Sequence, residues 1–277
     1  MRLTEAVRGR FCRWLYCALL ALVALAGMSG CASSPGGAAG GSGTDRVTDS
    51  DEPEIRKRAR IRLELAVGYF EQGKTTIALD EVKQSLVTDP DFADAYNLRG
   101  LIYMRLNDLG LAEESFRRAV ALNPRDANIL HNYGWLLCQQ ARYPEAVQAF
   151  TRALANPNYL ERSKTWMTQG LCQIKAGQPA EAEVSLIKSF ELDAGNPVTG
   201  YNLATLLYQR GDFSRALFYI RRLNNSQLAN AETLWLGIKV ERRLGNRVAA
   251  QQLAGQLRNL YPKSRELELF ERGAFNE

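Results

Sequence analysis

Residues 95–124, AYNLRGLIYMRLNDLGLAEESFRRAVALNP, contain the pattern that decides the fold. Small residues lie near the middle of each half of this stretch, at Gly100 and Ala112, and Asn107 separates the two halves. The bulky Phe116 follows Ala112 by four residues, about one helical turn. The stretch therefore predicts two helices that approach closely through small residues and are joined by a tight turn.

The same pattern recurs along the chain at steps of 34, 34, 36, 34 and 34 residues. The alanine register consists of Ala78, Ala112, Ala146, Ala182, Ala216 and Ala250. The turn register consists of Gly73, Asn107, Ala141, Gly177, Gly211 and Gly245. Upstream lies a third register of Ala66, Gly100, Gly134, Gly170, Ala204 and Ile238. Four residues after the alanines come Val82, Phe116, Phe150, Leu186, Ile220 and Ala254. Repetition at this period predicts stacked units rather than one ordinary domain.

A repeat of 34 residues with two small-residue registers resembles the tetratricopeptide repeat. The resemblance implies an all-α fold, an α-solenoid in which helix pairs stack into a right-handed superhelix. Pro90, Pro124 and Pro262 are expected to stop second helices, because proline cannot continue a helix. The stacking of neighbours buries the apolar surface that one pair alone cannot cover.

Six repeats are predicted within a domain of residues 54–277, near residues 59–92, 93–126, 127–162, 163–196, 197–230 and 231–264. The two extra residues of the third repeat are expected in a longer loop at NPNYLERS, residues 156–163. Repeat six matches worst, with Ile238 in place of a small residue. Residues 263–277 are expected to form a capping helix over the last repeat, which has no further neighbour.

The first helix of each pair carries an apolar stripe, at repeat positions 5, 9 and 12, on a different side from its inward stripe. In the first four repeats this stripe, called the groove stripe below, consists of Leu63, Val67 and Phe70; Asn97, Leu101 and Met104; His131, Trp135 and Cys138; and Met167, Leu171 and Ile174. A shift of one residue would place these side chains in the core. We prefer a partner-binding groove on the concave side, because Tyr96, Gly100 and Tyr103 already form an inward stripe. In repeats five and six the stripe is more polar and basic.

The N-terminus combines a basic segment, a short apolar run and small residues, which is typical of a secretory signal peptide over residues 1–30. The alternative is a transmembrane anchor, but the apolar run is shorter than the roughly 20 residues that a spanning helix needs. The motif MSGC, residues 28–31, resembles a lipobox, which implies lipidation of Cys31. Ala32 then implies sorting to the periplasmic face of the outer membrane. Residues 31–53 are expected to form a flexible tether of roughly 25 Å.

Two further cysteines, Cys138 and Cys172, remain after the signal peptide and Cys31 are set aside. In an oxidising compartment they could form a disulfide. They could equally be two buried small apolar side chains. The pattern leaves both alternatives open.

Composition and motifs argue against catalysis. The chain has one histidine, His131, and lacks HExxH, CxxC, GxSxG and phosphate-loop patterns. We therefore expect no enzyme activity, metal, cofactor or small-molecule substrate. The net charge of +5 falls to +2 without residues 1–30, so nucleic-acid binding is not expected either.

A narrower resemblance is carried by HNYGWLLCQQARYPEAVQAFTRAL (131–154), GLCQIKAGQPAEAE (170–183) and ETLWLGIKVERRLGNRVAA (232–250). These segments resemble the PilF/PilW family of type IV pilus biogenesis lipoproteins. Membership implies a pilotin, which binds the pilus secretin subunit and promotes its outer-membrane localisation and multimerisation, so supporting pilus biogenesis and twitching motility. The alternative is an envelope adaptor that recruits cell-wall hydrolases or other assembly factors.

Overall fold

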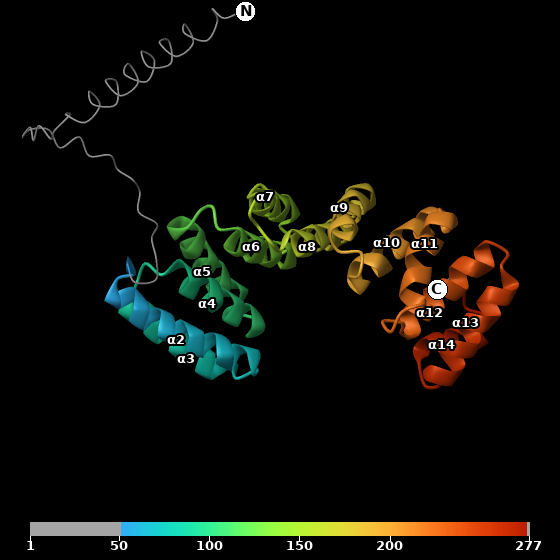
Figure 1. Cartoon of the computed structure of the whole chain (residues 1–277), viewed down its shortest axis with the longest axis horizontal. Helices are drawn as coiled ribbons and strands as arrows, with labels where there is room; N and C mark the ends of the chain where they lie inside the picture. The colour runs from blue at the N-terminus through green and yellow to red at the C-terminus, as the bar shows by residue number, and fades with distance from the viewer. Residues whose placement is uncertain (1–50, 276–277) are drawn as a thin grey trace, which may run out of the picture. The chain divides into compact units, whose positions relative to one another are not determined.

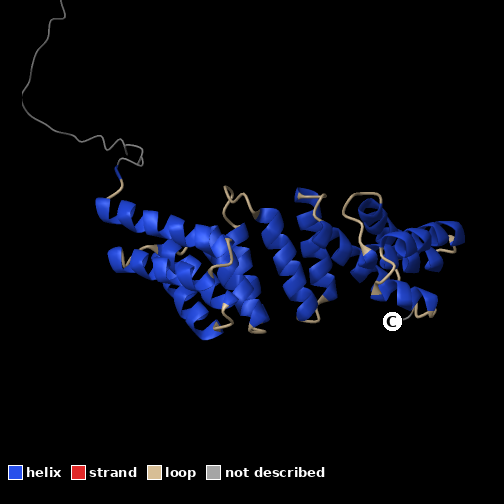
Figure 2. Ribbon diagram, turned by 90° about the horizontal axis from the view of Figure 1, so that it is seen from below, coloured by secondary structure: helices blue, strands red, loops and turns tan. Residues whose placement is uncertain are grey.

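The computed structural model describes residues 51–275. The chain divides into two units, residues 1–48 and 49–277, and the described residues all belong to the second. This second unit, the repeat unit, contains thirteen helices and no strand within residues 51–275 (Figures 1 and 2). The predicted all-α solenoid is confirmed. The signal peptide, Cys31 and the predicted tether before residue 51 lie outside the described residues.

Six helix pairs follow one another in chain order. They are α2 (Glu54–Glu71) with α3 (Thr75–Thr88), α4 (Ala93–Arg105) with α5 (Leu109–Leu122), α6 (Ala127–Gln139) with α7 (Tyr143–Leu154), α8 (Arg162–Lys175) with α9 (Pro179–Leu192), α10 (Pro197–Arg210) with α11 (Phe213–Asn224), and α12 (Ala231–Arg243) with α13 (Arg247–Leu260). The short helix α14 (Arg265–Glu271) follows the last pair. Within residues 51–275, none of these helices has both the length and the apolar composition that a membrane span requires.

The turn register has the backbone geometry that the sequence predicts. All six of its residues have positive φ values between 60° and 86°, including the non-glycine residues Asn107 and Ala141. This left-handed conformation reverses the chain after one helix so that the next can pack against it. Helices α3, α5 and α13 each end two residues before a proline, as expected.

Complementary side-chain sizes determine how the two helices of a repeat pack. A Cβ atom added at Gly100 would lie 2.7 Å from the Phe116 ring, and one added at Gly134 would lie 2.8 Å from the Phe150 ring. In repeat six the sizes are exchanged, because Ile238 on the first helix shares a buried cluster with Ala254 on the second. The poor match of repeat six is therefore a compensated exchange, which conserves core volume.

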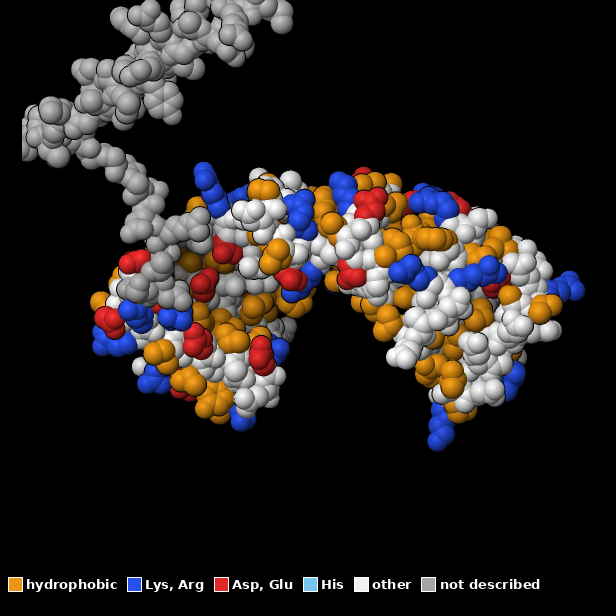
Figure 3. Space-filling model, in the orientation of Figure 1, with side chains coloured by type: hydrophobic (Ala, Val, Ile, Leu, Met, Phe, Trp, Pro, Cys, Tyr) orange, Lys and Arg blue, Asp and Glu red, His pale blue; other side chains and the backbone are white. Residues whose placement is uncertain are grey.

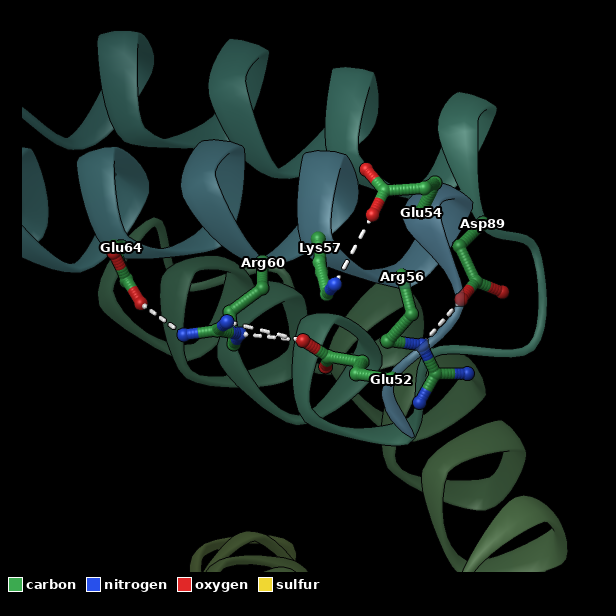
Figure 4. Close-up of polar contacts among 7 residues, drawn as sticks. All are labelled: Glu52, Glu54, Arg56, Lys57, Arg60, Glu64 and Asp89. Carbon is green, nitrogen blue, oxygen red and sulfur yellow. Dashed lines mark hydrogen bonds and ion pairs between the residues drawn. The ribbon is translucent and has the colours of Figure 1, made fainter. Parts of the chain in front are cut away.

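Helix α2 begins at Glu54, five residues before the predicted start of repeat one near residue 59. The extra turn is stabilised by ion pairs in the basic run that follows Glu54 (Figure 4). Arg56 pairs with Asp89 and stacks 4.4 Å from the centroid of the Phe92 ring. Arg60 pairs with Glu52 at 3.0 Å and with Glu64 at 3.3 Å. The repeat pattern does not include these charges, so it places the helix start too late.

The longer loop between repeats three and four lies where the spacing predicts it, between Leu154 and Arg162. It is held in place at both ends. Arg162 donates hydrogen bonds to the carbonyl oxygens of Leu154 at 2.8 Å and Asn156 at 3.2 Å. Tyr159, from the middle of the loop, is buried against Ala127, Leu130 and Ala153.

The helix pairs of the repeat unit form a curved row. First helices of successive repeats contact one another, whereas each described second helix contacts its own first helix and the helix that follows it. In Figure 1, α6 and α8 lie on the inner side of the curve, while α7 and α9 lie on the outer side. Figure 3 shows the hollow on the inner side, with hydrophobic side chains along its edge. The first helices therefore line the concave face.

Candidate functional site

The groove stripe lies on the first helices α2, α4, α6 and α8, which line the concave face. Its two most exposed side chains are those of Trp135, 42% exposed, and Val67, 38% exposed. Leu101 and Leu171, the counterparts of Trp135 one repeat away on either side, are half-buried. The position-9 residues of repeats one to four therefore form a row of apolar side chains that water can reach.

The remaining apolar residues of the stripe are half-buried, because they also pack against the core between repeats. Leu63 and Phe70 contact the core of repeats one and two. Leu101 and Met104 contact the cluster of Ala112, Phe116 and Leu136. Met167 and Ile174 contact the cluster around Leu186. The stripe therefore contributes partly to the core, while its position-9 side chains reach the concave surface.

Polar contacts fix two members of the stripe. Asn97 accepts a hydrogen bond of 3.0 Å from the side chain of Asn132 in the next repeat. Arg105 donates to the carbonyl oxygen of Phe70 at 2.6 Å and stacks 3.7 Å from the centroid of the Phe70 ring. In both pairs the partners are 35 residues apart, so they lie on neighbouring first helices.

The sequence pattern places His131 and Cys138 in the groove, and this prediction is wrong. Both side chains are buried, with 5% and 6% of their surface exposed. His131 Nδ1 lies 2.8 Å from the Thr165 hydroxyl oxygen, which in turn lies 2.9 Å from the Tyr159 hydroxyl oxygen. The longer loop brings Tyr159 into this buried triad. Burial, which is the larger cause, and the positive charge of Lys164 together lower the pKa of His131 to about 4. His131 therefore connects two repeats as a neutral side chain.

Cys138 and Cys172 are joined by a disulfide, with their Cα atoms 5.8 Å apart. The bond connects α6 to α8, the same two first helices that the His131 to Thr165 contact connects. Both pairs are separated by 34 residues, two fewer than the 36-residue step between repeats three and four. A search of the sequence for cysteine pairs about one repeat apart would therefore identify the disulfide. Tyr159 carries no such signal, because it lies in the irregular loop.

The concave residues of repeats five and six differ from those of the first four repeats. Trp235 is buried, and Lys239 lies 5.4 Å from the centroids of both the Trp235 and Tyr208 rings. Burial lowers the pKa of the Lys239 ammonium group. Arg242 stacks on the Phe275 ring. Cations and aromatic rings replace the aliphatic side chains here.

Among residues 51–275, no group of three or more His, Cys, Asp or Glu side chains has an arrangement that could hold a metal ion. The accessible position-9 row is an apolar surface that another chain can contact. Its apolar side chains can bind a complementary side chain or an amphipathic helix, since recognition of this kind depends on buried apolar area.

Comparisons with known proteins identify the family to which the chain belongs. A tetratricopeptide-repeat family model matches residues 63–127 and 133–197, and a second one matches residues 115–148. The chain is a tetratricopeptide-repeat protein. The type IV pilus assembly protein PilF of Pseudomonas aeruginosa is 32% identical over 254 residues, which cover 92% of this chain and 97% of that relative.

Two solved structures extend the similarity to the fold. The structure of Pseudomonas aeruginosa PilF has a TM-score of 0.71 and 32% identity, covering 79% of this chain and 99% of its own. The structure of PilW, described as a widely conserved type IV pilus biogenesis factor, has a TM-score of 0.70 and 30% identity with the same coverages. The chain therefore belongs to the PilF/PilW family of type IV pilus biogenesis proteins.

Proposed function

We propose that this protein is a pilotin for the pilus secretin, and that the groove stripe captures a segment of the secretin subunit. The observation that carries the proposal is the exposed Trp135, flanked by half-buried Leu101 and Leu171, in a chain of the PilF/PilW family. A large aromatic side chain at the centre of an apolar surface is typical of binding hot spots. A row of this kind on a free protein is also an aggregation liability, which a bound partner removes.

The rest of the proposal follows from the N-terminal sequence. Lipidation of Cys31 would anchor the protein in the inner leaflet of the outer membrane, since several acyl chains together bind a bilayer stably. The tether would let the repeat unit search for secretin near the membrane. Anchoring raises the effective concentration of the captured subunit where multimers assemble. The protein would act by binding and positioning alone, without making or breaking a bond.

The test compares secretin in cells with and without the gene. Outer-membrane fractions are resolved without full denaturation, and detergent-resistant secretin multimers are quantified against monomers. We expect multimers to be lost in the deletion strain, restored by the unchanged gene, and not restored by a gene with Cys31→Ser. Normal multimers and normal twitching in the deletion strain would reject the pilotin function. Restoration by the Cys31→Ser gene would reject the anchoring step alone.

A further inference from the structure

The concave face of repeat six is covered by the end of the described chain. After α14 ends at Glu271, Gly273 adopts a φ of +68° and turns the backbone toward α12. The Phe275 ring centroid then lies 5.2 Å from that of Trp235 and 6.0 Å from that of Phe270. Arg242 stacks on the same Phe275 ring, with its Cζ atom 3.6 Å from the ring centroid. Trp235, Phe270 and Arg242 form what we call the Phe275 slot.

The slot is part of the same groove as the stripe. Trp235 and Arg242 stand at positions 5 and 12 of repeat six, the positions that Leu63 and Phe70 occupy in repeat one. Phe275 therefore sits where a partner residue would sit if the partner continued along the groove. The structure thus displays an aromatic side chain bound at one end of the concave face.

The segment that carries Phe275 is weakly attached. Its backbone hydrogen bonds all stay within α14 and the segment, from Gly273 to Phe270 at 3.0 Å, from Ala274 to Leu269 at 2.9 Å and from Phe275 to Gly273 at 2.9 Å. Among the contacts described for residues 273–275, the Phe275 ring makes the aromatic and cation contacts with repeat six, and the small Ala274 side chain packs against the cluster that contains Trp235. The ring is only half-buried. It can therefore leave the slot without disturbing a helix.

A hollow of about 540 Å³ adjoins the slot and shares Arg242 and Phe270 with it. The other residues that line this hollow are Gly245, Arg247, Ala250 and Gln251. Because α14 has seven residues, half the length of α13, it leaves this part of the last repeat uncovered. The hollow gives room for residues that flank a bound aromatic side chain, and its arginines favour acidic ones.

We propose that the Phe275 slot is a second binding site, for an aromatic side chain flanked by acidic residues on a partner protein, and that Phe275 closes it in the free protein. The partner displaces Phe275 when it binds. Residues 273–275 are then an internal competitor, which lowers the apparent affinity for partners that lack the aromatic residue. This site is independent of whether the partner is the secretin, because its chemistry follows from the Phe275 contacts.

The test uses the full chain with Phe275→Ala and, as the probe, a synthetic peptide of residues 271–277, ERGAFNE. The indole N–H resonance of Trp235, assigned with a Trp235→Phe variant, reports whether the slot is filled. We expect Phe275→Ala to shift this resonance and the peptide to move it back in a saturable way. The protein with Phe275 intact should need an at least about tenfold higher peptide concentration for half-saturation, because a slot that is filled about nine-tenths of the time weakens a competing ligand by that factor.

Two controls make the outcome decisive. A peptide in which alanine replaces the phenylalanine should not move the Trp235 resonance. The variant Phe218→Ala, which truncates an exposed phenylalanine on α11, should leave the resonance unchanged. An equal response to both peptides, or no response in the Phe275→Ala protein, would overturn the proposal.

A second variant covers the case in which Phe275→Ala unfolds repeat six. Gly273→Val in the intact chain strains the turn at φ +68° that delivers Phe275 but leaves Trp235, Phe270 and Arg242 unchanged. We expect it to loosen Phe275, so that the ERGAFNE peptide now moves the Trp235 resonance at lower concentration than in the unchanged protein. An unchanged titration would show that Phe275 is a fixed structural cap and would also overturn the proposal.

Discussion

The concave face is open at Trp135, position 9 of repeat three, and closed at Trp235, position 5 of repeat six. Trp135 is 42% exposed, whereas Trp235 is 5% exposed beneath the aromatic rings of Phe270 and Phe275. The chain can therefore cover a tryptophan on its concave face, and it does so at repeat six. The exposure of Trp135 is therefore not a general property of tryptophan residues on stacked helix pairs. The difference favours a partner for the open region.

The open region is also the part of the row with the strongest connections between repeats. A disulfide and the triad of His131, Thr165 and Tyr159 join α6 to α8 and the longer loop. Repeats five and six are joined instead by Arg221, which pairs with the buried Glu241 at 2.8 Å. Rigid first helices keep Trp135 and Leu171 in a fixed relation, which lowers the entropy lost when a partner binds.

The largest expected effect comes from breaking the covalent connection. Replacement of Cys138 and Cys172 by alanine should lower the free energy of unfolding by about 4 kcal/mol, because the closed loop of roughly 34 residues no longer restricts the unfolded chain. Urea unfolding followed by circular dichroism measures the change. Reduction of the unchanged protein should have the same effect. A loss below about 1 kcal/mol would show that the disulfide contributes little to this joint.

The next largest effect should come from the open region itself. Trp135→Glu should weaken capture of the purified secretin subunit by about 30-fold or more, the loss typical of a central aromatic contact. The matched control is Leu111→Glu, because Leu111 is 41% exposed but lies on the second helix α5. Both variants should keep the helical circular dichroism of the unchanged protein. Equal capture by the two variants would remove the groove stripe from the binding site.

The regular part of the fold can be predicted from the sequence, because each repeat encodes its own local geometry. Small residues, turn residues and prolines act within one helix pair, so Asn107 and Ala141 could be assigned to turns without any knowledge of distant contacts. The position-9 row of Val67, Leu101, Trp135 and Leu171 was predictable for the same reason. Its accessibility follows from helical spacing once the first helices are placed.

The rest depends on contacts that the repeat does not contain. His131 is buried because an irregular loop delivers Tyr159 next to Thr165. Trp235 is buried because the chain turns back at Gly273 and places Phe275 over it. The early start of α2 coincides with ion pairs of Arg56 and Arg60, which belong to none of the registers that define the repeat. Such contacts join segments that have no common period, so periodicity cannot reveal them.

Acid should weaken the joint between repeats three and four selectively. The pKa of His131 is lowered from 6.5 to about 4 in the folded protein, so the unfolded chain binds the proton more tightly. The contribution of neutral His131 is fully present above pH 6.5 and is lost as the pH falls from 6.5 to 4. At pH 5 the expected loss relative to pH 7 is about 2 kcal/mol.

The check is urea unfolding at several values between pH 5 and pH 7. Since His131 is the one histidine in the sequence, His131→Gln should remove most of the slope in this range while keeping a hydrogen-bonding partner for Thr165. The joint between repeats five and six has no histidine, so it should not respond over this interval. A slope that survives in the variant would assign the pH dependence to other groups.

The smallest effect is expected from glycine-to-alanine substitutions. One such substitution in each region compares how closely the helices pack there. Gly134→Ala in repeat three places a Cβ atom 2.8 Å from the buried Phe150 ring and should cost about 1–3 kcal/mol of stability through overpacking. Gly255→Ala in repeat six meets no atom within 4 Å and should stabilise by about 0.5–1 kcal/mol, because alanine favours a helix interior over glycine. Thermal unfolding of both variants measures the two signs. If Gly134→Ala is also stabilising, Phe150 can move aside, and close contact through small residues does not determine how these helices pair.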